Sequence, residues 1–148
     1  METGMYRDDR TIRAVVENFE RCLYAPEEFT HPRHLTVATW YLCTLSEGAA
    51  LTRMRESLLR FTAHHGEQGY NETITRFWML LITEHLGRQR EGLSHVERVN
   101  DVVVRYPKET LFDYYSRDLV MSEFARREWL EPDLRTICED AAHCEFKD

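Results

Sequence analysis

The sequence predicts an all-α fold, a helical bundle of about four longer helices with additional short C-terminal helices. Apolar residues recur every three to four positions through most of the chain, which is the period of an amphipathic helix. Ser, Thr, Asn, Gly and Pro stand where these periodic segments begin and end. The one strand-like stretch, Val102–Val104, has no partner strand, and a lone strand cannot satisfy its own backbone. We therefore interpret it as the end of a helix.

Proline and a capping residue define the first two predicted helices. Helical periodicity runs from 7 to 23, and Pro26 ends any continuation. Thr30 stands where an N-cap is expected, with Pro32 in the first turn that follows. The second helix is predicted to run to about Leu45.

Glycines separate the next two predicted helices. Gly48 precedes a third helix, which is expected to end near Gly66 with glycine at the C′ position. After a short loop, Asn71 is the expected N-cap of a fourth helix that stops at Gly87. This segment is the most apolar of the chain, so we expect it at the centre of the core.

The last third of the chain is predicted to hold shorter helices. One covers 93–106, and proline opens the next, over 107–115. Serine caps a third, over 122–129, and Pro132 breaks it. A last turn or two is expected over 134–144.

Length and composition indicate one domain over 1–148, with ends, about 1–6 and 145–148, that are candidates for disorder. The 148 residues contain no Gly/Ser/Pro-rich linker. No apolar run approaches the ~18 residues that a membrane span needs, and the charged N-terminal segment does not resemble a signal peptide. The sequence thus predicts a soluble, cytoplasmic protein without a membrane partner.

Charge and cysteine usage exclude two further classes of protein. The net charge of −7 would repel a phosphate backbone, and the basic residues are interleaved with acidic and apolar ones. We therefore expect no nucleic acid partner. Four scattered cysteines form no C-x-x-C pair, which favours buried reduced thiols over a zinc knuckle or a redox motif.

The most unusual local feature is a pair of histidines, His31 and His34, in the first turn of the predicted second helix. Positions three apart on a helix lie about 60° from each other, so both imidazoles can lean toward the bundle interior. Such a pair can donate two nitrogens to one metal ion, and the helix dipole favours the neutral imidazoles that ligation requires. The alternative, one histidine bonded to a neighbouring carbonyl and the other facing solvent, stays open.

A second polar cluster, Tyr70 and Glu72, opens the predicted fourth helix. If the second and fourth helices are neighbours with N-termini that point the same way, Tyr70 and Glu72 would converge with His31 and His34 on one cavity. Two nitrogens and a carboxylate would suit one divalent transition metal with an open position. A glutamate in a first turn is also expected simply because it complements the helix dipole.

The segment after Tyr114 suggests a different site, for an anionic ligand. Ser122 and Arg126 belong to a run of hydroxyl and guanidinium groups, and Arg126 is the best single candidate for holding an anion. Helix capping by Ser122 and surface ion pairs are the alternative explanation. Two other histidines, His85 and His95, show no partner pattern.

Three segments together resemble a family of small, uncharacterised all-helical bacterial proteins. They are F-T-H-P-R-H-L-T-V-A from Phe29, Y-N-E-T-I-T-R-F-W from Tyr70, and the stretch Y-Y-S…S-E-F-A-R…P-D-L that ends at Leu134. The family pattern carries F-x-H-x-x-H-L, Y-H-E-T and S-x-x-A-R…P-D-L, and it implies no established activity. The positions that match it residue by residue are His31, His34, Tyr70, Glu72, Thr73, Ser122 and Arg126. The chain departs from the pattern at Asn71, where the pattern has histidine.

These observations lead to two hypotheses for the function. The first is a metal-dependent enzyme for a small molecule, in which His31, His34 and Glu72 hold the metal and Glu72 and Tyr70 take part in catalysis. In it Arg126, Thr73 and Ser122 contact the ligand. The second is a non-catalytic module that binds a small ligand or another protein, including a second copy of itself.

Overall fold

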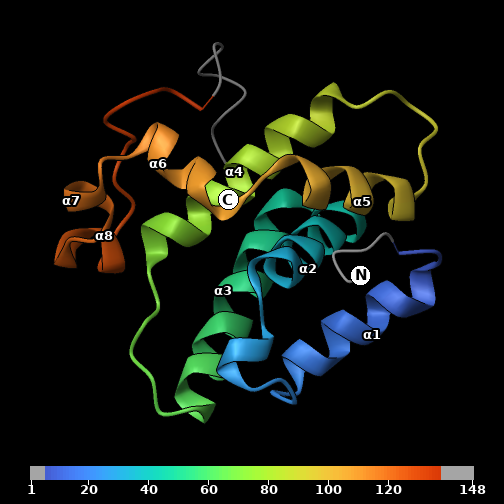
Figure 1. Cartoon of the computed structure of the whole chain (residues 1–148), viewed down its shortest axis with the longest axis horizontal. Helices are drawn as coiled ribbons and strands as arrows, with labels where there is room; N and C mark the ends of the chain where they lie inside the picture. Colours follow the sequence, from blue (N-terminus) through green and yellow to red (C-terminus); the bar gives the residue numbers. More distant parts are fainter. Residues whose placement is uncertain (1–5, 138–148) are drawn as a thin grey trace.

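The computed structural model describes residues 6–137. These residues form helices joined by loops and contain no strand (Figure 1). The all-α prediction is therefore confirmed. In chain order the helical segments are α1 (Asp9–Glu20), η1 (Pro26–Glu28), α2 (His31–Thr44), α3 (Glu47–His64), α4 (Glu72–Arg88), α5 (His95–Arg105), η2 (Lys108–Thr110), α6 (Leu111–Tyr114), α7 (Arg117–Val120) and α8 (Glu123–Arg127).

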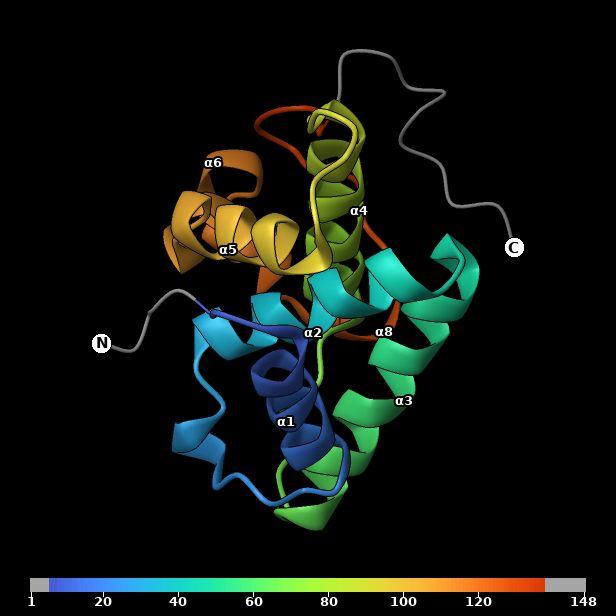
Figure 2. The same ribbon diagram turned by 90° about the vertical axis from the view of Figure 1, so that its right-hand side faces the viewer.

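Helix α2 lies at the centre of the molecule and packs against α1, α3, α4 and α5 (Figures 1 and 2). Because helices surround it, five consecutive residues, 35–39, are buried. The sequence placed the fourth helix at the centre instead. Helix α4 has a different role, because opposite sides of it enter two separate apolar clusters. Met79 and Ile82 belong to the cluster of α1, α2, α3 and α5, whereas Phe77 and Leu81 pack with α6 and α7.

Two of the predicted N-cap residues, Asn71 and Ser122, make side-chain capping bonds. The Asn71 side chain accepts from the Ile74 N–H at 2.9 Å, and the Ser122 side chain accepts from the Ala125 N–H at 3.2 Å. Thr30 occupies the N-cap of α2 without a side-chain capping bond. Gly66 follows α3 with φ +66°, a conformation that glycine adopts without the steric cost other residues pay.

Several predicted boundaries differ from the structure, among them the end of the first helix, which is Glu20 rather than residue 23. Gly48 lies inside α3, because Ser46 caps that helix two residues earlier. Gly87 likewise lies inside α4, which continues to Arg88. Residues 134–137 form no helix, and the rest of the helix expected over 134–144 lies outside the described residues.

None of the helices within residues 6–137 is both long enough and apolar enough to cross a lipid bilayer.

Candidate functional site

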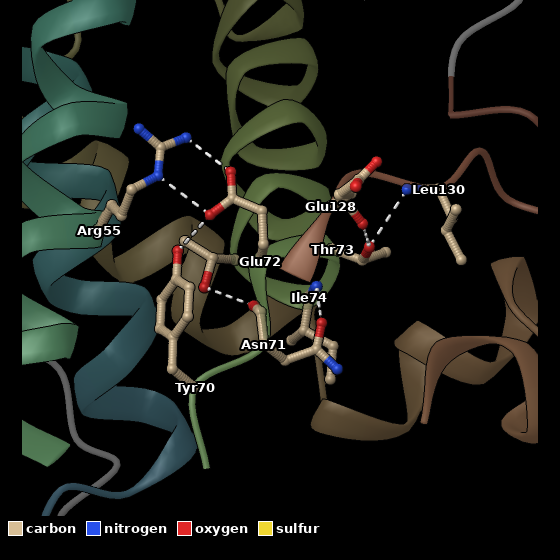
Figure 3. Close-up of polar contacts among 9 residues, drawn as sticks. Arg55, Tyr70, Asn71, Glu72, Thr73, Ile74, Glu128 and Leu130 are labelled. Carbon is tan, nitrogen blue, oxygen red and sulfur yellow. Dashed lines mark hydrogen bonds and ion pairs between the residues drawn. The ribbon is translucent and has the colours of Figure 1, made fainter. Parts of the chain in front are cut away.

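The start of α4 is held by an ion pair to α3 (Figure 3). Arg55 donates through Nε to Oε1 of Glu72 at 3.0 Å and through Nη2 to Oε2 at 2.6 Å, the two-pronged geometry in which a guanidinium matches a carboxylate. The Tyr70 hydroxyl donates to the same Oε1 at 2.6 Å. The two residues expected to be catalytic, Tyr70 and Glu72, are therefore in contact, with Arg55 as a third member that the sequence did not indicate.

These contacts fix the protonation states of all three groups. Burial opposes the ionisation of Glu72, but the hydrogen bonds from Arg55 and Tyr70 outweigh it and hold the pKa below the ordinary 4.5. Burial, together with the bond to Glu72, raises the pKa of Tyr70 to about 12. The bonds to Glu72 raise the pKa of Arg55 as well. At neutral pH the cluster is a carboxylate, a phenol and a guanidinium that satisfy one another.

On the other side of α4, Thr73 and Asn71 bind the C-terminal segment (Figure 3). The Thr73 hydroxyl donates to the Glu128 carbonyl at 2.7 Å and accepts from the Leu130 N–H at 3.2 Å. The Asn71 side chain, besides capping α4, donates to the Val120 carbonyl at 2.9 Å. The first turn of α4 thus joins α3 to the segment around α7 and α8.

The two candidate ligand contacts in α8 have different surroundings. Ser122 accepts from the Ala125 N–H and donates to the Leu119 carbonyl at 2.7 Å, so helix capping accounts for its hydroxyl. Arg126 is exposed, whereas the preceding Ala125 is fully buried. Arg126 therefore points to solvent and Ala125 faces inward.

The two histidines at the start of α2 point to different neighbours. His31 Nε2 lies 2.9 Å from the Tyr106 carbonyl, and its ring meets Trp78 edge-on at 5.0 Å. The ring of His34 packs on Phe29 at 4.0 Å. Burial lowers the pKa of His31, and burial together with the neighbouring His31 lowers the pKa of His34 to about 4. Both imidazoles are therefore neutral at physiological pH, and the cause is burial rather than the helix dipole.

The expected convergence of His31, His34 and Glu72 is not found. Helices α2 and α4 do pack together, but Glu72 points to α3 whereas His31 points to the end of α5. Within residues 6–137, no three His, Cys, Asp or Glu side chains are grouped so that they could hold a metal ion. Metal binding stays a prediction that these contacts do not support.

A polar cavity of about 490 Å³ lies at the opposite end of α4. Its walls are the last turns of α4, the end of α5, η2, α6 and residues 135–137. The charged side chains among the lining residues are Glu84, Arg88, Arg105, Asp113 and Arg135, and His85 and Tyr106 line it as well. The volume lies in the range of ordinary small-molecule sites.

Two of the three arginines in this cavity have no acidic partner within the described chain. Arg88 pairs with Glu84 at 2.9 Å. Arg105 and Arg135 make no ion pair with any residue of 6–137, and the Arg135 guanidinium lies 5.0 Å from the centre of the Tyr114 ring. The cavity lining therefore carries three guanidinium groups and two carboxylates, in a chain whose net charge is −7.

Sequence reasoning missed this cavity because its members come from separate parts of the chain. His85 and Arg88 lie in the last turn of α4, and Arg105 lies in the last turn of α5. The basic residues at two helix ends are visible in the sequence, but the dipole of each helix explains them separately. Only the packing of α4 against α5 brings them to one cavity.

Comparison of the chain with protein-family models, curated proteins and solved structures finds no match. The resemblance to the small bacterial family stays a prediction.

Proposed function

We propose that this protein binds a small anionic molecule, a carboxylate or a phosphate ester, in the cavity at the C-terminal end of α4. The observation that carries the proposal is the excess of cations in this cavity. Three arginines face two carboxylates, and Arg105 and Arg135 are left without an ion pair in the described chain. Guanidinium groups bind carboxylates and phosphates through paired N–H donors, so an anionic ligand supplies the missing partners.

The size and polarity of the cavity support a small ligand over a macromolecule. A volume of about 490 Å³ accommodates a metabolite-sized compound. Part of the arginine charge balances the partial negative charge at the ends of α4 and α5, which reduces the charge available to a ligand. We therefore expect moderate affinity, in the micromolar to millimolar range, because ~4–8 kcal/mol of binding free energy corresponds to that range.

The proposed cavity differs in its location from the one that the sequence suggests. A polar cavity for a small molecule is expected from the sequence, but at the start of α4 rather than at its end. A metal-dependent reaction, a homo-oligomer and a cytoplasmic location stay predictions.

Anion-dependent thermal stabilisation tests this proposal. Wild-type protein would be heated with inorganic phosphate, citrate, 2-oxoglutarate and glucose 6-phosphate, beside sodium chloride at matched ionic strength. A ligand that binds only the folded state raises Tm in proportion to its occupancy. We expect at least one organic anion to raise Tm more than matched chloride does, with an affinity that calorimetric titration then measures.

The double substitution Arg105→Gln/Arg135→Gln should weaken this binding about tenfold or more, because each charge-assisted hydrogen bond contributes about 1.5–3 kcal/mol. The matched control is Arg127→Gln, since Arg127 is an exposed arginine of α8 that pairs with Glu123 outside the cavity. Equal stabilisation of the wild type and the double variant by every anion would contradict the proposal.

A further inference from the structure

A chain of three hydrogen-bonded side chains, Asp101, His85 and Tyr106, reaches the cavity, and the last two line it. His85 Nε2 lies 2.7 Å from Oδ2 of Asp101, and the Tyr106 hydroxyl lies 3.0 Å from Nδ1 of the same imidazole. His85 comes from α4, whereas Asp101 and Tyr106 come from α5 and its C-cap. A carboxylate, an imidazole and a hydroxyl in this order form an arrangement that moves protons in enzymes.

The direction of the two bonds follows from the charge of Asp101. Hydrogen bonds from Gln89 and His85 hold the pKa of Asp101 below its ordinary value, so its carboxylate only accepts. In the tautomer of His85 that donates to this carboxylate, Nε2 carries the ring proton and Nδ1 is an acceptor. The Tyr106 hydroxyl consequently donates to Nδ1. Its oxygen also accepts from the Arg105 side chain, which leaves one lone pair for a group in the cavity.

Two members of this chain, Asp101 and Tyr106, are fixed by further contacts. Asp101 also accepts from Gln89 Nε2 at 2.9 Å, and Gln89 in turn accepts from Arg98 at 2.8 Å. The Tyr106 carbonyl is bound by His31 at 2.9 Å. Such second contacts hold reacting groups in one geometry, which is what catalysis requires. They also give His31 a role at this cavity, through the position of Tyr106.

A hydrogen-bond network that served only to join α4 to α5 would not need to reach a cavity. His85 and Tyr106, however, both line the cavity. The His85 side chain is 11% exposed and that of Asp101 is 48% exposed, so protons can exchange with water. The cavity therefore combines a proton relay with the cations of the proposed anion site.

We propose that the protein catalyses a proton shift within a small anionic carbonyl compound bound in this cavity, with Tyr106 as the group that exchanges protons with it. This inference rests on the proposed anion binding. In the forward step the C–H bond next to the carbonyl breaks, and its proton moves to the Tyr106 oxygen while the Tyr106 proton moves to Nδ1 of His85. The products are an enolate and an imidazolium. The reverse transfer returns a proton to the ligand, at the same carbon or at another atom, and no co-reactant is consumed.

The charges in the cavity suit this step. Burial raises the pKa of Tyr106, although Arg105 opposes the shift, so Tyr106 stays a phenol and passes a proton on as it receives one. The positive charge falls on His85, beside the Asp101 carboxylate. The negative charge falls on the enolate oxygen, near the cavity arginines, which stabilise it. A carbon acid fits this site because the negative charge on the enolate oxygen develops only as the proton leaves the carbon.

Deuterium exchange tests this inference. Pyruvate, 2-oxoglutarate and dihydroxyacetone phosphate would each be incubated with the protein in D₂O, and loss of the C–H signal next to the carbonyl would be followed by proton NMR. We expect exchange of at least one probe above the buffer rate. Tyr106→Phe and His85→Gln should each slow it by about 10²- to 10⁴-fold, the usual contribution of a general acid or base.

Matched controls separate the relay from a general effect of substitution. Tyr24→Phe removes a phenol that stacks near Phe29, and His95→Gln removes an imidazole that contacts Trp40, so neither should alter the exchange rate. Thermal unfolding of Tyr106→Phe and His85→Gln would confirm that both are folded at the assay temperature.

The outcomes distinguish the two proposals. Anion binding without exchange, or exchange that persists in folded Tyr106→Phe, would overturn the proton shift and leave the binding site intact. Failure of every anion to bind at the cavity arginines would overturn both. Exchange that requires Tyr106 and His85, with binding preserved in Tyr106→Phe, is the result we expect.

Discussion

The two ends of α4 are both rich in polar side chains, yet they differ in whether those side chains have partners. At the N-terminal end, Arg55, Tyr70 and Glu72 satisfy one another (Figure 3). The Thr73 hydroxyl binds the backbone of Glu128 and Leu130. At the C-terminal end, Arg105 and Arg135 line a cavity and make no ion pair within residues 6–137. A polar cluster whose members are saturated stabilises the fold, whereas one with unused donors is available to a ligand.

If the N-terminal cluster also binds a ligand, the two ends of α4 do not differ in function. If its substitution affects only stability, they do. The largest effect on stability is expected for Glu72→Gln. The substitution leaves Arg55 without a counter-charge in a partly buried position, and we expect it to lower the free energy of unfolding by about 2–3 kcal/mol. For a chain of this size that corresponds to a Tm roughly 4–12 °C lower.

The stability lost in Glu72→Gln should depend on pH. The folded state lowers the pKa of Glu72, so its contribution to stability is present above the ordinary pKa of 4.5 and is lost as the pH falls through the folded value. The difference between wild type and Glu72→Gln should therefore shrink below about pH 4.5 in urea unfolding. Glu123→Gln, which breaks an exposed ion pair, is the control and should cost less than about 0.5 kcal/mol. Unchanged anion binding in Glu72→Gln is expected, and a loss of it would remove the distinction between the two ends.

Thr73→Val is expected to have the next largest effect. It keeps the shape of a fully buried side chain but removes the hydrogen bonds to Glu128 and Leu130, and we expect a loss of about 1–2 kcal/mol. Thr83→Val is the matched control, because the Thr83 hydroxyl donates only to the Met79 carbonyl of its own helix. Urea unfolding measures both, and equal losses would show that the bonds across α4 contribute nothing specific.

The smallest effects are expected in α8. Ser122→Ala removes an N-cap and should cost about 1 kcal/mol, whereas Arg126→Ala removes an exposed side chain and should change stability by less than about 0.5 kcal/mol. Anion titration of both variants completes the test. Weakened binding in Arg126→Ala would restore this residue as the ligand contact that the sequence suggested.

Local features of the chain could be predicted because local chemistry determines them. Asn71 caps α4 through a bond to a residue three positions later, and Gly66 ends α3 through its own backbone freedom. The histidine pair at the start of α2 is neutral mainly because it is buried, whereas the sequence argument relied on the helix dipole. The Gly48 boundary is wrong because Ser46, a stronger N-cap, lies two residues earlier.

The site could not be predicted in the same way, since its contacts join residues from different helices. Glu72 meets Arg55 across 17 positions, and His85 meets Asp101 across 16. No periodic pattern links such positions. His31 illustrates the limit, because its spacing from His34 suggested a shared metal, whereas its nitrogen contacts the carbonyl of Tyr106, 75 residues away.

The helical fold class and most helix starts could be predicted from the sequence. The spacing of apolar residues, helix capping and glycine conformation all act within a few residues. The tertiary structure alone decided which polar groups are satisfied and which are left open. That outcome depends on how α4 lies against α3 at one end and against α5 at the other. Hydrogen bonds and ion pairs act over about 3 Å, so a polar residue acquires its role only when packing fixes its neighbours.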